Sequence, residues 1–280
     1  MLMRLQHYYC CFFLFLASTS PLIVVSAFFF DQSTNNKKSN SQPIVIEVCE
    51  NKHCCKHYTG KAATLVQTLR QIIPGENSYE IRSSGCLSNC KDGPNIQINK
   101  NKNTILHNGI TSPHVAAAVL ELNDDKLKIH PTFLAACQVM DRAEEATTLD
   151  EKKRNLDSVI GALNKNSDNE LSRSKCMAHA LVLRARAILD FSSFDHLDEA
   201  REDIRLASEL DPHHSTVWRV MADIELESDG GRAPYAIQAL QRWAQYQPQF
   251  ATKVNREIQR INDDDFNVFA DNKKRKKTLQ

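Results

Sequence analysis

Hydrophobic residues follow two different patterns along the chain, and the change between them falls near residue 125. Pro43 to Val48 is a β-branched run of strand length. Gly60 to Pro74 carries apolar residues at intervals of three and four, which predicts an amphipathic helix ended by Pro74 and Gly75. Ser78 to Arg82 suits a second strand. A strand, a helix and a strand in this order predict a parallel pair.

The next forty residues predict a hairpin and a second helix. Pro94 to Ile98 and Thr104 to His107 flank a run of alternating Asn and Lys, which favours two antiparallel strands. Ser112 and Pro113 suit the N-cap and first position of a helix that follows. The expected order over residues 43–125 is β-α-β-β-β-α, an α/β domain.

From about residue 132 the apolar pattern is helical, and part of it repeats. Residues 133–146 and 149–163 predict one helix pair, and residues 250–261 a final capping helix. Four positions recur after 36 residues: Ala200, Ile204, Ala207 and Pro212 match Ala236, Leu240, Trp243 and Pro248.

This repetition resembles the tetratricopeptide repeat (TPR), whose period is about 34 residues. Trp218, Met221 and Ala222 open the second copy as that family's motif does, whereas Trp243 stands where the family prefers a small residue. The resemblance implies an all-α, TPR-like domain over residues 132–262. Because stacked helix pairs form a concave surface, it also implies a protein partner.

Composition and charge limit the classes of function. The chain has 280 residues, of which 42% are hydrophobic and 25% charged, and its net charge is +1. These values exclude a wholly disordered chain and a polytopic membrane protein, and they provide no general attraction for nucleic acid. Residues 263–280 contain a basic run from Lys273 to Lys277, which predicts a charged, disordered tail.

Sequence motifs of independent catalysis are missing. We find no nucleotide-binding glycine loop, no His-Glu metal helix and no nucleophile elbow. The isolated histidines, including His213 and His214, are expected to be helix caps or surface residues. The chain is therefore expected to have no catalytic activity of its own.

The first 42 residues are typical of targeting sequences. Residues 1–27 combine one basic residue, an apolar stretch and a small-residue end at Ala27, as a secretory signal peptide does. Residues 28–42 are rich in serine and poor in acids, which is transit-peptide composition. With Phe28 after the cleavage site, they resemble the bipartite presequence of algae whose plastids derive from a red alga. This implies the plastid stroma, with no stable membrane span after cleavage; the alternatives are the secretory pathway or an uncleaved anchor.

Four of the nine cysteines form two short pairs. Cys49 and Cys54 are spaced C-x4-C, and after 31 intervening residues Cys86 and Cys90 are spaced C-x3-C, each pair following a predicted strand. Such pairs can hold zinc, form structural disulfides in an oxidising compartment or bind a [2Fe-2S] cluster. Dithiol exchange is disfavoured, because C-x-x-C does not occur.

The segments around these pairs resemble the thioredoxin-like [2Fe-2S] ferredoxins. The resemblance covers residues 44 to about 122 and includes the GC-x3-C-x2-GP motif from Gly85 to Pro94. That family contains small plastid and cyanobacterial proteins and a subunit of NADH dehydrogenases. The resemblance implies a thioredoxin-like fold and a [2Fe-2S] cluster held by Cys49, Cys54, Cys86 and Cys90.

The sequence thus predicts an α/β thioredoxin-like domain followed by an all-α TPR-like domain. The expected function is that of a plastid one-electron carrier, redox sensor or oxidoreductase subunit that the repeats dock on a partner. The alternative is an assembly or scaffold factor whose first domain is structural or binds zinc. Cys55 is expected to have no role, and Cys137 and Cys176 to be small core residues.

Overall fold

Two parallel strands organise the N-terminal part of the chain. In the computed structural model, β1 (Ile44–Cys49) pairs in parallel with β2 (Tyr79–Ser84), in register from Ile44 opposite Tyr79 to Cys49 opposite Ser84. The structure describes residues 43–73, 78–87, 90–100, 103–165, 170–191, 194–214, 216–228 and 232–263, and at Cys90 and Phe194 the main chain only. The predicted leader and residues 264–280 of the predicted tail lie outside the described residues.

A hairpin and three helices complete this part of the chain, which we call the sheet region (residues 43–125). The sheet has the order β2-β1-β3-β4, with antiparallel pairing of β1 to β3 and of β3 to β4. Its remaining elements are α1 (Lys52–Cys55), α2 (Leu65–Ile72), the 3-10 turn η1 (Cys90–Asp92), β3 (Ile96–Lys100), β4 (Asn103–His107) and α3 (Pro113–Asn123). The predicted α/β order is confirmed, and α1 is an additional short helix that the pattern did not predict.

Side-chain caps determine where the two longer helices begin. Ser112 caps α3 as predicted, because its hydroxyl accepts a hydrogen bond from the N–H of Val115 at 3.3 Å. The predicted start of α2 at Gly60 is wrong by five residues. Thr64 and Gln67 form a reciprocal capping box that begins the helix at Leu65.

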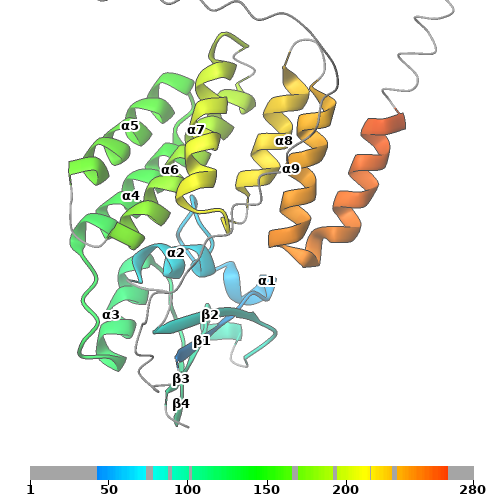
Figure 1. Ribbon diagram of the computed structural model, residues 1–280. Coiled ribbons are helices and arrows are strands. Elements are labelled where there is room, and N and C mark those ends of the chain that lie inside the picture. The colour runs from blue at the N-terminus through cyan, green and yellow to red at the C-terminus, as the bar shows by residue number, and fades with distance from the viewer. Residues whose placement is uncertain are drawn as a thin grey trace, which may run out of the picture. The chain divides into compact units, whose positions relative to one another are not determined.

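Consecutive helices then follow to the end of the described chain and form the helical region (residues 131–263). They are α4 (Pro131–Glu145), α5 (Leu149–Lys165), α6 (Glu170–Asp190), η2 (Phe194–His196), α7 (Leu197–Leu210), α8 (Val217–Glu227), α9 (Ala233–Tyr246), η3 (Pro248–Phe250) and a helix over residues 251–263. Each of the helices α4 to α9 packs against the next (Figure 1). The expected change from an α/β to a helical pattern is confirmed.

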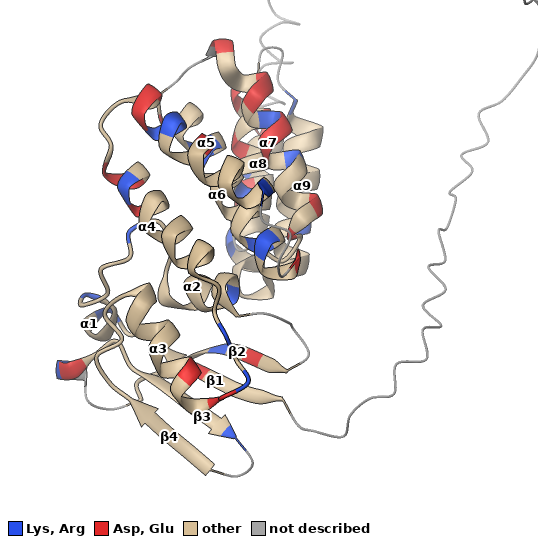
Figure 2. Cartoon of the chain, turned by 90° about the vertical axis from the view of Figure 1, so that its left-hand side faces the viewer, with Lys and Arg blue, Asp and Glu red and all other residues tan. Residues whose placement is uncertain are grey.

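Ion pairs connect the helices to one another. Arg184 of α6 pairs with Asp203 of α7 at 2.6 Å and also contacts Asp157 of α5. Within α8, Arg219 and Asp223 form an i, i+4 ion pair at 2.9 Å. Figure 2 shows basic and acidic residues interspersed along these helices. The charges of the helical region are thus largely mixed, not gathered into one sign.

One hydrophobic core runs through both regions. It includes Ile46 and Val48 of β1, Leu69 of α2, and Phe133 of α4, each no more than 1% exposed. Helix α2 packs against both α4 and α6, and the described residues all belong to one compact unit. The expected domain boundary near residue 125 stays a prediction.

Phe133→Ala tests the shared core. Phe133 is fully buried, so truncation is expected to lower the free energy of unfolding by about 3–5 kcal/mol, through lost apolar burial and the cavity left behind. Urea unfolding followed by circular dichroism measures the loss. Leu122→Ala is the control, because Leu122 is 77% exposed, and an equal loss in both variants would contradict the assignment of the core.

Candidate metal centre

The first cysteine of the predicted set lies at the end of the parallel pair. Cys49 is the last residue of β1, is fully buried, and stands opposite Ser84, the last residue of β2. Its N–H donates to the carbonyl oxygen of Asn95 at 3.0 Å. The strand end is therefore fixed on both sides, by β2 and by the segment that leads into β3.

The second cysteine lies on α1, three residues beyond β1. The helix begins because the side chain of Asn51 accepts a hydrogen bond from the N–H of His53 at 3.0 Å. The N–H groups of Cys54 and Cys55 both donate to the carbonyl oxygen of Asn51, at 2.8 and 2.9 Å. Cys54 is fully buried, so this short helix turns one thiol of the first pair inward.

The second cysteine pair follows β2. Cys86 comes two residues after the last residue of β2 and is exposed. Cys90 begins η1, which packs against α1; its side chain lies outside the described part of the structure. The backbone thus brings the Cys90 turn beside the helix that carries Cys54.

Gly93 allows this close approach. A Cβ atom on Gly93 would lie 3.0 Å from the Cα of Cys54 and still closer to its Sγ. A Cβ atom on Gly85, before Cys86, would have no other atom within 4 Å. Of these two glycines in the motif, only Gly93 is required by packing.

Cys55 has a structural contact that the sequence did not indicate. Its half-buried thiol donates a hydrogen bond to the carbonyl oxygen of Cys49 at 3.3 Å. Burial, with smaller contributions from Cys49 and Glu50, raises the pKa of this thiol. Cys55 therefore ties α1 back to the end of β1 as a neutral thiol.

The two remaining described cysteines are core residues, as predicted. Cys137 and Cys176 are buried on α4 and α6. Burial, with a smaller contribution from Asp141, raises the pKa of Cys137 to about 12, and burial also raises the pKa of Cys176. Both stay protonated, so neither is a nucleophile or a ligand at neutral pH.

Exposed charges surround the two cysteine pairs. Lys52, Lys56 and Lys91 are exposed, and none of them forms an ion pair with another described residue. Glu50 and Asp92, also exposed, bring the opposite charge. The balance around the pairs is basic.

The described side chains do not by themselves assemble a metal site. Among the residues that the structure describes, no group of three or more His, Cys, Asp or Glu side chains is arranged to hold a metal ion. Two buried thiols, one exposed thiol and the glycine-lined turn that begins at Cys90 are nonetheless at one end of the sheet. A four-cysteine site is compatible with this arrangement, and it stays a prediction.

A buried histidine pair was missed by sequence reasoning. His214 was expected to be a helix cap or a surface residue, but it is not on the surface, because it is only 6% exposed. Its Nε2 lies 2.8 Å from Nδ1 of His179. Desolvation lowers the pKa of His179 to about 4 and the pKa of His214 as well. No local signal reveals the pair, because its members are 35 residues apart.

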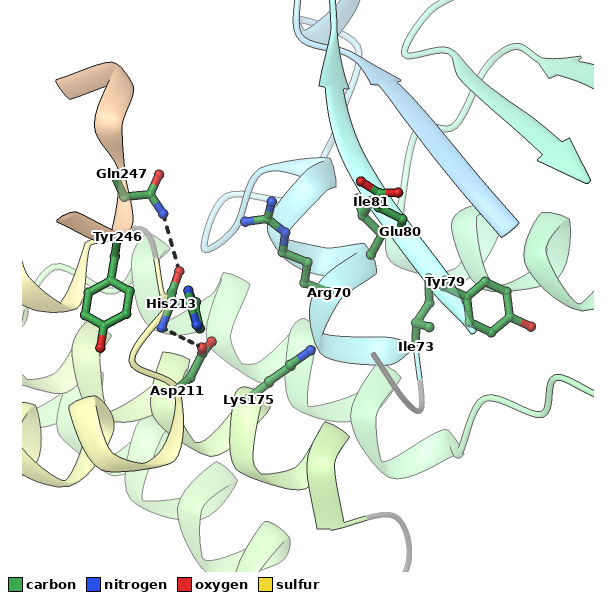
Figure 3. Close-up of a pocket in the computed structure, with 10 residues that line it drawn as sticks. All are labelled: Arg70, Ile73, Tyr79, Glu80, Ile81, Lys175, Asp211, His213, Tyr246 and Gln247. Carbon is green, nitrogen blue, oxygen red and sulfur yellow. Dashed lines mark hydrogen bonds between the residues drawn. The ribbon is translucent and has the colours of Figure 1, made fainter. Parts of the chain in front are cut away.

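A cleft of about 620 Å³ lies between the two regions, and His213, which precedes His214 in the chain, is one of the residues that line it (Figure 3). Arg70 of α2 and Lys175 of α6 line it together with His213. The N–H of His213 donates to Asp211 at 3.2 Å, and Gln247 donates to the carbonyl oxygen of His213 at 3.4 Å. These bonds hold the loop between α7 and α8, on which His214 lies.

No protein-family model, curated protein or solved structure matches the chain. Among the described residues, no helix has the length and apolar character needed to cross a membrane. The function must therefore be argued from the residues themselves.

Gly93→Ala tests the close approach of the two cysteine segments. The added methyl group would collide with Cys54, so we expect a loss of about 1–3 kcal/mol in the free energy of unfolding. Gly85→Ala is the matched control, because its methyl group meets nothing within 4 Å. Urea unfolding of both variants measures the difference, and an equal effect at the two glycines would show that the turn is not packed on α1.

Proposed function

We propose that the chain binds a [2Fe-2S] cluster through Cys49, Cys54, Cys86 and Cys90 and serves as a one-electron carrier or redox sensor. The observation that carries the proposal is the meeting of the two cysteine segments at one end of the sheet, where Gly93 packs against Cys54. Two short cysteine pairs supply the four thiolates that such a cluster needs.

The topology of the sheet region supports a thioredoxin-like domain. A parallel β-α-β unit followed by an antiparallel hairpin and a helix, in the sheet order β2-β1-β3-β4, is the arrangement that the resemblance implies. In this arrangement Cys49 closes β1 and Cys86 follows β2. Both pairs therefore belong to the loops at the carboxyl ends of the parallel strands.

Four protein thiolates limit the chemistry to electron transfer. When bound, such a cluster supplies one-electron transfer, and with four thiolate ligands its irons have no open position for a substrate. The four cysteines would hold the cluster. The two buried ones, Cys49 and Cys54, would lie on its side away from solvent. The protein then acts as a carrier, a sensor or a subunit of an oxidoreductase, with no catalysis of its own.

The helical region is proposed as a TPR-like surface for a protein partner. The support is the order in which α4 to α9 pack on one another and the burial of the repeated positions Ala200, Ala207, Ala236 and Leu240. Trp243 is also buried and stacks on Phe250, with 5.0 Å between ring centroids. The large side chain at this repeat position is accommodated by packing against the turn that follows α9.

The plastid stroma remains the proposed location. It rests on the composition of residues 1–42 and on Phe28, all outside the described residues. A reducing stroma agrees with thiolates that serve as ligands and not as disulfides.

Anaerobic reconstitution of the full chain with iron and sulfide tests the cluster. We expect a coloured protein with about two irons and two sulfides per chain, and an EPR signal that appears on reduction with dithionite. Cys86→Ser is expected to lose most of the colour, because it removes the exposed ligand. Cys55→Ser is the matched control and is expected to keep it.

Two outcomes would contradict this proposal. A colourless protein with one zinc per chain would favour the alternative, a scaffold factor whose first domain is structural. Loss of the cluster in Cys55→Ser but not in Cys54→Ser would show that Cys55, and not Cys54, is the second ligand.

Lys52→Glu combined with Lys91→Glu tests the electrostatics of the site. Reduction adds one negative charge, so nearby cations stabilise the reduced state and raise the potential. The double reversal is expected to lower the midpoint potential by roughly 20 mV for each unit of charge at about 10 Å in a water-like dielectric. Protein-film voltammetry at low salt measures it. Lys126→Glu combined with Lys128→Glu, both exposed in the segment between α3 and α4, changes the total charge by the same amount and is the control; an equal shift there would remove the local explanation.

A further inference from the structure

The cleft between the two regions gathers basic side chains from three separate elements. Its volume of about 620 Å³ lies within the range of pockets that bind small molecules. Arg70 comes from α2, Lys175 from α6 and His213 from the loop between α7 and α8. Figure 3 shows the guanidinium group of Arg70 and the ammonium group of Lys175 extending into the space that the ring of His213 faces. The fold thus brings three nitrogen donors to one hollow.

Hydrogen bonds fix the backbone of the loop that carries His213. The N–H of His213 donates to Oδ1 of Asp211 at 3.2 Å, and its carbonyl oxygen accepts from Nε2 of Gln247 at 3.4 Å. The indole N–H of Trp218 donates to the carbonyl oxygen of Pro212 at 2.9 Å. The loop is therefore held by α8 and by the residue that follows α9.

The imidazole of His213 is also positioned, although this residue is exposed. It meets the ring of Tyr246 edge to face, with 4.8 Å between the ring centroids, and Tyr246 stacks on Trp218 at 5.8 Å. A side chain that is ordered before binding loses little conformational entropy when a ligand contacts it. His213 is therefore a preorganised donor at the edge of the cleft.

The acidic residues that line the cleft are engaged by other groups. The two carboxylate oxygens of Glu80 accept hydrogen bonds from Arg82, at 2.5 and 2.6 Å. Asp211 accepts from the backbone of the loop, as described above. Arg70, by contrast, is exposed and forms no ion pair with another residue in the described part of the chain. The positive charge of Arg70 is therefore available to an anion in the cleft.

A phosphate group suits these donors better than a carboxylate does. A phosphate monoester presents three acceptor oxygens in a tetrahedral arrangement, which can face donors from three elements, whereas the two oxygens of a carboxylate lie in one plane. Arginine and lysine are both common phosphate ligands. Ile73, Ile81 and Tyr246 line the same cleft and offer apolar surface to the rest of a phosphorylated molecule.

We propose that this cleft binds a phosphorylated small molecule, whose phosphate group is held by Arg70, Lys175 and His213. The site needs no cluster and stands apart from the proposed electron transfer.

Isothermal titration calorimetry of the full chain with phenyl phosphate tests the site at neutral pH and low salt. We expect one molecule bound per chain, with at least about tenfold higher affinity than for benzoate, because a carboxylate forgoes one charge-assisted hydrogen bond. Inorganic phosphate is expected to bind at least about threefold more weakly than phenyl phosphate, because it leaves the apolar surface uncovered. No binding of phenyl phosphate in the millimolar range, or equal affinity for either of the other two anions, would overturn the proposal.

Charge-removing variants show whether the anion binds in this cleft. Arg70→Gln and Lys175→Gln are each expected to weaken the binding of phenyl phosphate about tenfold, the loss of one charge-assisted hydrogen bond. Arg154→Gln removes the same charge from an exposed position on α5 and is the matched control, expected to change the affinity less than about twofold. An equal loss in the control would show a general charge attraction and contradict the site.

The neighbouring cleft provides a second control. It has a volume of about 500 Å³, shares Arg70 and Gln247 with the first cleft, and is lined by Arg186 but not by Lys175. Arg186→Gln is therefore expected to keep the affinity of the wild type. A loss of binding in Arg186→Gln but not in Lys175→Gln would place the anion in the neighbouring cleft and overturn the proposal.

Nitrogen-15 NMR of the wild-type imidazoles gives a result that depends on no variant. The ring nitrogens of His213 are expected to shift when phenyl phosphate is added, whereas those of His114, exposed on α3, are expected to stay unchanged. Saturable binding without a shift at His213, or an equal shift at His114, would overturn the proposal.

Discussion

The hydrogen bonds of residues 58–64, the connecting segment between α1 and α2, constrain much of the structure around them. The N–H of Thr59 donates to the carbonyl oxygen of Thr111 at 2.8 Å, whereas the backbone groups of Lys61 and Ala62 bond to side chains. Asp141 and His179, on two different helices, supply these partners. Because α1 precedes the segment and α2 follows it, the same bonds limit the position of a cysteine helix and of the helix that covers the sheet.

The position of α1 in turn limits where the second cysteine pair can lie. Cys54 is buried against Gly93, and the N–H of Cys49 is bonded to Asn95. The turn that begins at Cys90 is thereby packed between the end of β1 and the helix after it. The helical region is thus connected, through the connecting segment, to the residues that we propose as ligands.

The sequence predicted what local patterns encode. β-branched runs identified the strands, and Ser112 with Pro113 identified the start of α3, because these signals act over a few residues. The start of α2 was missed although a local signal was present, the capping box of Thr64 and Gln67. What could not be predicted locally is that Lys61 and Ala62, before that box, bond to side chains of α4 and α6. His179 and Ala62 are 117 residues apart, and no sequence window contains both. The four-cysteine set came from spacing and resemblance, and the described side chains place three of its members.

The bond from His179 to Ala62 joins two parts of the chain that lie 117 residues apart. An unpaired buried carbonyl costs about 1–3 kcal/mol, so a donor from α6 stabilises the position of Ala62. The imidazole of His179 can donate from Nε2 to this carbonyl oxygen in both its neutral and its protonated form. The carboxylate of Asp141 accepts from the N–H groups of Lys61 and Ala62 beside it. An imidazole from α6 and a carboxylate from α4 thus satisfy a donor and an acceptor of the same short segment, which fixes it to two helices at once.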